Sequence, residues 1–174
     1  MYEINDTVLY GGHGVCRIVE IEERDLCGNR MEYYILKPVY DEKSTVFVPV
    51  HNEALTTKMR RILSVDEIYA LIASMPNEDS KWIENENERK EKYREIISCG
   101  DRIQLIRAIK ALYQHQQEQQ ARGRKLHLAD ERFFKEAEKM LYDEFALVLH
   151  IKPEQVFPFI QEQIHVSKNR QPVQ

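Results

Sequence analysis

Long apolar runs, a signal peptide and an excess of basic residues are all missing from this sequence. No stretch of the 174 residues approaches the roughly 20 consecutive apolar residues that a membrane-spanning helix needs. The N-terminus alternates acidic and apolar residues, so it has neither the basic nor the apolar region of a signal peptide. These absences exclude a membrane protein and predict a cytoplasmic protein that does not bind a membrane.

Cysteine is scarce, and histidine does not occur in metal-binding patterns. Cys16, Cys27 and Cys99 are an odd number at wide spacing, which fits neither a disulfide framework nor paired CxxC metal ligands. The six histidines form no HExxH motif that would place two ligands on one helix face. We therefore expect reduced, structural thiols, no metal and no cofactor.

The charge balance is slightly acidic, with 25 Lys and Arg against 29 Asp and Glu and a net charge of −4. The acidic surplus is divided about evenly between residues 1–63 and the rest of the chain. Because nucleic-acid binding depends on basic side chains that neutralise phosphates, any contact with DNA must be local and weak. No helix rich in Arg, Asn and Gln is evident that could read base edges, so such contact is expected to be sequence-nonspecific.

Up to Leu63 the apolar pattern has a period near two, which is typical of β-strands. Runs of β-branched and aromatic residues predict five strands, at residues 7–10, 15–24, 31–39, 44–50 and 59–63. Their short connections require antiparallel neighbours. A lone sheet of this size buries its apolar face best by curling into a small open barrel of the Tudor or SH3 kind. We expect this module to form without help from the rest of the chain.

The fourth predicted strand contains an aromatic residue on its outer face. Val46, Val48 and Val50 alternate with other residues and should face the core, which places Phe47 on the opposite side. An aromatic side chain left in water there loses hydrophobic free energy unless something covers it. Either a neighbouring loop or the helical half covers Phe47, or it belongs to a surface that docks on a partner.

After Leu63 the apolar spacing becomes helical. Ser64 and Glu67 form a capping box at the start of the first helix. Helices are predicted at residues 64–75, 80–98, from 101 onwards, at 129–150, and finally up to about 166. Pro158 should divide the last of these into a short turn and a helix, because proline removes a backbone hydrogen bond. The tail should be disordered.

These patterns predict an α+β protein with three parts. A five-stranded antiparallel module occupies residues 1–63, an all-helical domain follows at residues 64–166, and residues 167–174 form the tail. No part contains a recognisable catalytic arrangement. The glycine-rich segment at residues 11–14 joins two strands and lacks the spacing of a phosphate-binding loop, so it is interpreted as a structural turn.

Trp82 is the sole tryptophan, and its surroundings are polar. On a helix its neighbours on the same face would be residues 85, 86 and 89, which are Asn, Glu and Arg. Two interpretations stay open. Trp82 is either a packing residue of the core, or an anchor at an interface, including a wedge between base steps of DNA.

Several segments of the chain match the pattern of a known family. In the N-terminal half these are residues 5–10, His13-Gly14-Val15, Ile18, Ile21-Glu22, Gly28, residues 33–36 and residues 46–49. In the C-terminal half the match is looser and comprises Trp82, residues 98–101, Asp130-Glu131, Ala137, Leu141 and Glu144. Taken together, these segments resemble the CarD/CdnL transcription regulators, whose N-terminal module is similar to the polymerase-interacting domain of transcription-repair coupling factors.

The resemblance implies a transcription regulator that is not an enzyme and has no small-molecule substrate. Its β module would dock on the β subunit of bacterial RNA polymerase through a strand edge, with Arg24 and Phe47 facing the polymerase. Its helical domain would contact promoter DNA at the upstream edge of the melted bubble and modulate the stability of the open complex.

The same resemblance places a set of DNA-binding residues in the helical half. Trp82 would lie at the minor groove, and its basic partners would be Arg89, Lys90 and Lys92. Two features depart from the family pattern: position 47, often basic in relatives, is Phe, and acidic residues follow Trp82. Two other hypotheses remain, namely a protein adaptor or self-associating scaffold with no DNA role, and a Cys or His enzyme.

Overall fold

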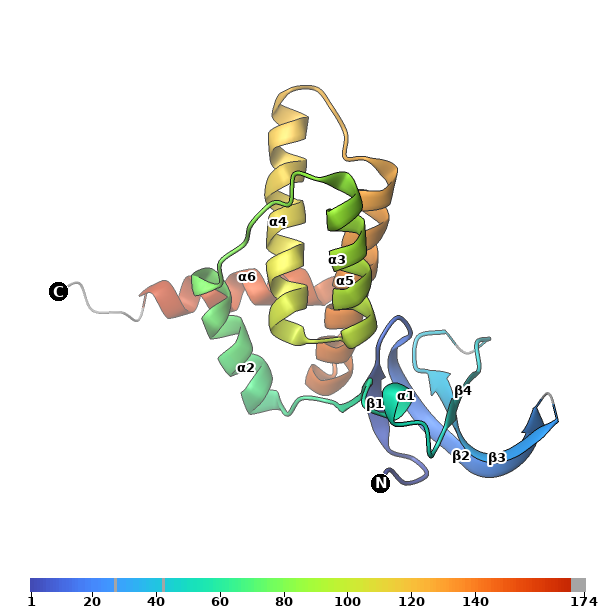
Figure 1. Ribbon diagram of the computed structural model, residues 1–174. Coiled ribbons are helices and arrows are strands. Elements are labelled where there is room, and N and C mark those ends of the chain that lie inside the picture. Colours follow the sequence, from blue (N-terminus) through green and yellow to red (C-terminus); the bar gives the residue numbers. More distant parts are fainter. Residues whose placement is uncertain (27, 42, 170–174) are drawn as a thin grey trace.

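A computed structural model describes residues 1–26, 28–41 and 43–169 (Figure 1). Five strands form one antiparallel sheet in the order β4-β3-β2-β1-β5, which confirms the predicted sheet. The strands are β1 (Thr7–Tyr10), β2 (Gly14–Leu26), β3 (Asn29–Pro38), β4 (Val46–Pro49) and β5 (Met59–Arg61). A single helical turn, α1 (Glu53–Thr56), joins β4 to β5.

The sheet curls around a small apolar core of its own. All five strands contribute to it, with Val8 and Tyr10, Cys16 and Ile18, Tyr34 and Leu36, Val48, and Met59. The register between β2 and β3 shifts between Ile18 and Glu20, and a bulge of this kind bends a strand and increases its twist. The curl leaves β4 and β5 as the two outer strands of the sheet.

After β5 the described chain is mainly helical, which confirms the α+β class. Its elements are α2 (Val65–Ser74), the 3-10 turn η1 (Met75–Asn77), α3 (Glu86–Cys99), α4 (Arg102–Ala121), α5 (Leu128–Leu149) and α6 (Pro153–Asn169). The predicted Ser64–Glu67 capping box is present, and Asp101 caps α4. None of the helices in the described residues has the length and apolarity of a membrane span.

Two helix predictions were wrong. The helix predicted from residue 80 begins only at Glu86, because the side chain of Asn85 accepts hydrogen bonds from the backbone N–H groups of Asn87 and Glu88 and caps α3 there. The last helix is continuous through Pro158 to residue 169, with Val156 and Ile160 buried on either side of the proline. Their packing compensates for the lost backbone hydrogen bond. Of the tail predicted to be disordered, residues 167–169 belong to α6, and residues 170–174 lie outside the described residues.

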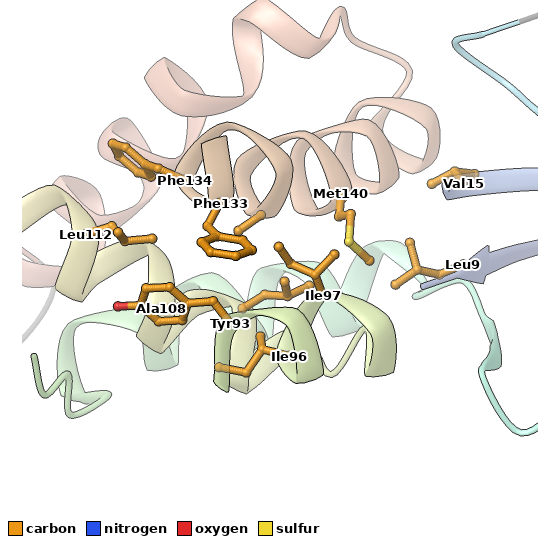
Figure 2. Close-up of a cluster of buried hydrophobic side chains, with 12 residues drawn as sticks. Leu9, Val15, Tyr93, Ile96, Ile97, Ala108, Leu112, Phe133, Phe134 and Met140 are labelled. Atoms are coloured by element: carbon orange, nitrogen blue, oxygen red, sulfur yellow. The ribbon is translucent and has the colours of Figure 1, made fainter. Parts of the chain in front are cut away.

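The sheet and the helices share a second apolar core (Figure 2). Leu9 and Val15 come from the sheet, and the other buried members are Tyr93, Ile96, Ile97, Leu105, Ala108, Leu112, Phe133, Phe134, Ala137 and Met140 from α3, α4 and α5. Gly11 lies so close to the end of α3 that a Cβ atom there would be 1.8 Å from the carbonyl oxygen of Ser98. The two parts are therefore in direct contact, and the sheet's own core does not bury Leu9 and Val15.

A buried ion pair also holds the segment that connects the sheet to α2. Arg102 on α4 donates to both carboxylate oxygens of Glu144 on α5, at 3.0 and 2.6 Å, and Glu144 is fully buried. Arg102 donates to the carbonyl of Arg61 at the end of β5 (2.7 Å), and Glu144 accepts from the N–H of Leu63 in the connecting segment (2.9 Å). Side chains of the helices α4 and α5 thus hold the junction between the sheet and the helical part.

Candidate functional site

The two side chains expected to face the polymerase meet at the β4 edge of the sheet. The guanidinium of Arg24 lies over the ring of Phe47, 5.1 Å from its centroid, and the ring of Tyr33 meets Phe47 edge to face at 6.4 Å. Glu22 forms an ion pair with Arg24. Phe47 is 37% exposed, while Val48 beside it is fully buried, as the alternation predicts. The outer strand therefore presents an aromatic ring with a cation stacked on it.

Trp82 lies on the chain that connects η1 to α3, and is half-buried. Its indole stacks on the imidazole of His115 from α4, with centroids 3.6 Å apart and planes at 12°. The guanidinium of Arg89 lies over the indole at 4.4 Å. Trp82 also packs against the shared core, so it contributes to packing whatever else it does. The helical neighbours considered from the sequence do not apply, because residue 82 is not on a helix.

Arg89 is a buried anchor of this connecting chain. Its guanidinium donates to both carboxylate oxygens of Asp130 on α5, at 2.8 and 2.9 Å, and to the backbone carbonyls of Ile83 (2.8 Å) and Glu84 (3.3 Å). With 3% exposure, it cannot reach a phosphate. The expectation that Arg89 contacts DNA directly is therefore corrected: this side chain positions the segment that carries Trp82.

The other two predicted basic residues lie on the surface of α3. Lys90 is half-buried and forms an ion pair with Glu86, and Lys92 is paired with Glu95 at 3.1 Å. Lys90 lines a groove between α3 and α5, and Lys92 does not line it.

Sequence reasoning missed three other residues that line this groove. Arg94 follows Lys90 by one helical turn, Arg132 comes from α5, and Leu128 at the start of α5 is 83% exposed. Glu136, paired with Arg132 at 3.1 Å, is the carboxylate of the groove. The four-residue spacing of Lys90 and Arg94 is a signal that the sequence does contain, since it places both cations on one helix face. The groove brings three cations and an exposed leucine together.

Of the two cysteines that the structure describes, neither lies on β4 or lines the groove between α3 and α5. Burial raises the pKa of the Cys16 thiol to about 12, which keeps it protonated and unreactive. Cys99 is exposed at the end of α3, where Arg60 donates to its sulfur at 3.1 Å and to its carbonyl at 2.8 Å. Cys27 lies outside the described residues. Within the part of the chain that the structure describes, no cluster of His, Cys, Asp or Glu could hold a metal ion.

The structure thus joins a curled sheet with an aromatic outer edge to a bundle of helices. Comparison with protein families finds the same two parts. Residues 2–63 match the CarD-like/TRCF RID domain, and residues 68–161 match the CarD C-terminal domain. The chain therefore belongs to the CarD family. It is a non-catalytic transcription regulator that interacts with RNA polymerase.

Proposed function

We propose that the β4 edge docks on the β subunit of RNA polymerase, while the helical part contacts promoter DNA at the upstream edge of the bubble and modulates open-complex stability. The observation that carries the proposal is the exposed Phe47 ring with Arg24 stacked on it at an outer strand of the polymerase-interacting domain.

Several properties of this edge support docking. An outer strand has backbone groups that can pair with a strand of a partner. Aromatic and arginine side chains are the commonest energetic anchors of protein interfaces, and here Phe47 and Arg24 already hold each other in place. Less conformational entropy is lost on binding when such side chains are already ordered.

The DNA contact rests on the groove between α3 and α5 together with Trp82. The groove contains three cations that can neutralise phosphates, Lys90 and Arg94 from α3 and Arg132 from α5. Lys92 is exposed elsewhere on α3. The buried Arg89–Asp130 pair links the Trp82 segment to the start of α5, from which the groove residues Leu128 and Arg132 come. Because the chain as a whole is acidic, this contact is weak and sequence-nonspecific.

The docking proposal is tested with Phe47→Asp in the full chain, measured as binding to the isolated β subunit. A charge in place of the anchor ring should weaken binding by at least about thirtyfold, the effect of losing a major interface residue. Val19→Asp is the matched control, because Val19 is a similarly exposed apolar residue on β2. Unchanged binding of the Phe47 variant would refute the assignment of this surface.

The DNA proposal is tested by measuring how the binding constant K of the chain for a complex of polymerase and a fork-junction promoter fragment depends on salt concentration. Replacing both Arg94 and Arg132 by Gln should lower the slope of log K against log salt by roughly 0.7 to 0.9 for each phosphate that the groove no longer neutralises. Lys152→Gln, an exposed cation outside the groove, serves as control. If the slope stays the same, the helical part makes no DNA contact through this groove, and the adaptor hypothesis gains support.

A further inference from the structure

A second groove lies away from both surfaces, where η1, α4, α5 and α6 meet. Its volume is about 470 Å³, and its lining is mostly apolar, with Ile106, Leu141 and Ile160 among the buried side chains. This size falls in the range of roughly 300 to 1,000 Å³ that is usual for small-molecule sites. Neither the docking edge nor the proposed DNA contact uses this groove.

Glu138 on α5 is a half-buried carboxylate in the wall of this groove. Its hydrogen-bond partner is the hydroxyl of Tyr142 at 3.5 Å, and among the described residues no Lys or Arg lies within ion-pair distance of it. Burial accordingly raises the pKa of Glu138. Lys110, the cation in the same wall, donates to the carbonyls of Met75 (2.9 Å) and Glu78 at the end of η1, so its hydrogen bonds are directed there.

Four aromatic side chains line the groove together with this carboxylate, and the ion-paired Glu131 and Lys135 line an adjoining hollow. Tyr113 from α4, Phe134 and Tyr142 from α5, and Phe157 from α6 line the groove together with Glu138. The same five residues also line this adjoining hollow, so they occupy the place where the two cavities meet. Tyr113 and Phe157 are 48% and 43% exposed, which is a large apolar surface to leave in water at one location.

We propose that this groove binds an organic cation, specifically an alkylated ammonium compound with a short apolar body. The faces of aromatic rings attract such cations, and alkylated ammonium groups lose less hydration than a lysine ammonium when they enter an apolar site. The carboxylate of Glu138 supplies the opposite charge. An anion would be repelled by it, and a neutral apolar compound would desolvate it without a partner.

The proposal is tested by NMR titration of the full chain with choline and with its neutral isostere 3,3-dimethylbutan-1-ol. We expect saturable shifts of residues in the groove with choline at millimolar concentrations, and at least about tenfold weaker binding of the alcohol, equivalent to the loss of one favourable cation contact. Equal affinity for the two compounds, or no saturable shift with choline, would overturn the proposal.

Two variants locate the site. Glu138→Gln should weaken choline binding about tenfold while leaving the weak binding of the alcohol unchanged, and Glu162→Gln, an exposed position on α6, should change neither. Phe157→Leu keeps an apolar side chain but removes a ring, so it should weaken choline binding selectively. Its partial exposure makes it tolerable for folding, which melting curves verify. Choline binding that persists unchanged in both groove variants would place the site elsewhere and refute the assignment.

Discussion

At the scale of single residues, the structure separates cations that hold the chain together from cations that can reach a partner. Arg89 and Arg102 are both paired with buried carboxylates. Arg89 also donates to backbone carbonyls of the segment before α3, and Arg102 to the backbone carbonyl at the end of β5. Losing one member of such a pair typically costs 3 to 5 kcal/mol, because the other charge is left buried. Arg94, in contrast, is exposed. Burial decides which arginine is available for binding.

Trp82 allows a test that distinguishes packing from DNA contact, because its stacking partner His115 can be removed separately. Trp82→Ala and His115→Ala both break the stack of 3.6 Å and should each lower the free energy of unfolding by about 1 to 3 kcal/mol. If Trp82 itself contacts DNA, only Trp82→Ala should also shorten the lifetime of the open complex by a further factor of about 5 or more. Denaturant unfolding and open-complex decay measure the two effects.

Equal effects of the two variants on open-complex lifetime would make Trp82 a packing residue alone. Polymerase binding by the β module serves as the control, since neither substitution lies in residues 1–63. The sequence left open whether Trp82 packs in the core or contacts DNA, and a half-buried indole is compatible with both. The comparison with His115 addresses this choice, because both variants break the stack and only Trp82→Ala removes the indole.

At the scale of elements, the first turn of α2 is stabilised by hydrogen bonds to the ionised carboxylate of Glu67. The backbone N–H of Ser64 donates to Glu67 at 2.8 Å, and Arg61 donates to the same carboxylate at 2.8 Å. These hydrogen bonds lower the pKa of Glu67 to about 2, with the bond from Arg61 making the largest contribution. A carboxyl whose pKa is lower in the folded state contributes stability above its unfolded value of about 4.3 and loses it as the pH falls toward the folded value.

We therefore predict that Glu67→Gln flattens the loss of stability between about pH 4.5 and pH 2. The wild-type chain should lose more unfolding free energy over this interval than the variant does. Asp66→Asn, one residue away, should follow the wild type, because Asp66 takes no part in the capping box. Urea unfolding at several pH values measures the difference. Parallel curves for wild type and Glu67→Gln would mean that the capping box contributes nothing that acid can remove.

The elements themselves were largely predictable, because each has a local signal. The alternation of Val46, Phe47 and Val48 and the capping box at Ser64 act within a few residues, and the structure contains both as expected. The start of α3 was missed because Ser80 and Asn85 are both acceptable N-cap residues in sequence. The choice depends on Arg89, which holds the preceding backbone through a partner 41 residues away in the chain.

The remaining part of the candidate site could not be predicted for the same reason. Arg132 and Lys90 line one groove only because α3 and α5 pack together, and nothing in the local pattern of either helix shows this. The pairing of Arg24 with Phe47 depends likewise on strand register, with β3 lying between their strands. A sequence shows which residue types share one face of a helix or strand. Which side chains from different elements meet is known only once the fold is known.

At the scale of the whole molecule, the sheet and the helices should unfold as one cooperative unit. Leu9 and Val15 are buried against helices, and Glu144 accepts from the segment that follows β5. Fluorescence of the sole tryptophan, in the helical part, should therefore give the same urea midpoint as far-ultraviolet circular dichroism, which reports on the whole chain. Differing midpoints in the wild type would show that the parts unfold separately.

Glu144→Ala tests the junction directly. It leaves the guanidinium of Arg102 without its carboxylate and frees the N–H of Leu63, so it should cost about 3 to 5 kcal/mol and separate the two midpoints. Glu136→Ala, which removes an exposed carboxylate from the same helix, should cost less than about 1 kcal/mol and leave the midpoints together. A variant at Glu144 that stays cooperative would show that the shared apolar core alone joins the parts.

The tight contact between Gly11 and Ser98, with the shared core beside it, has a consequence for affinity. Two binding surfaces on one packed body turn the second binding step into an intramolecular one. Under the proposed function, docking on polymerase would present the helical groove to promoter DNA at an effective concentration on the order of millimolar, enough to saturate a contact whose dissociation constant is about 0.1 mM. An acidic chain that hardly binds free DNA could therefore still occupy it at the promoter, and loosening the junction would reduce that occupancy without changing either surface.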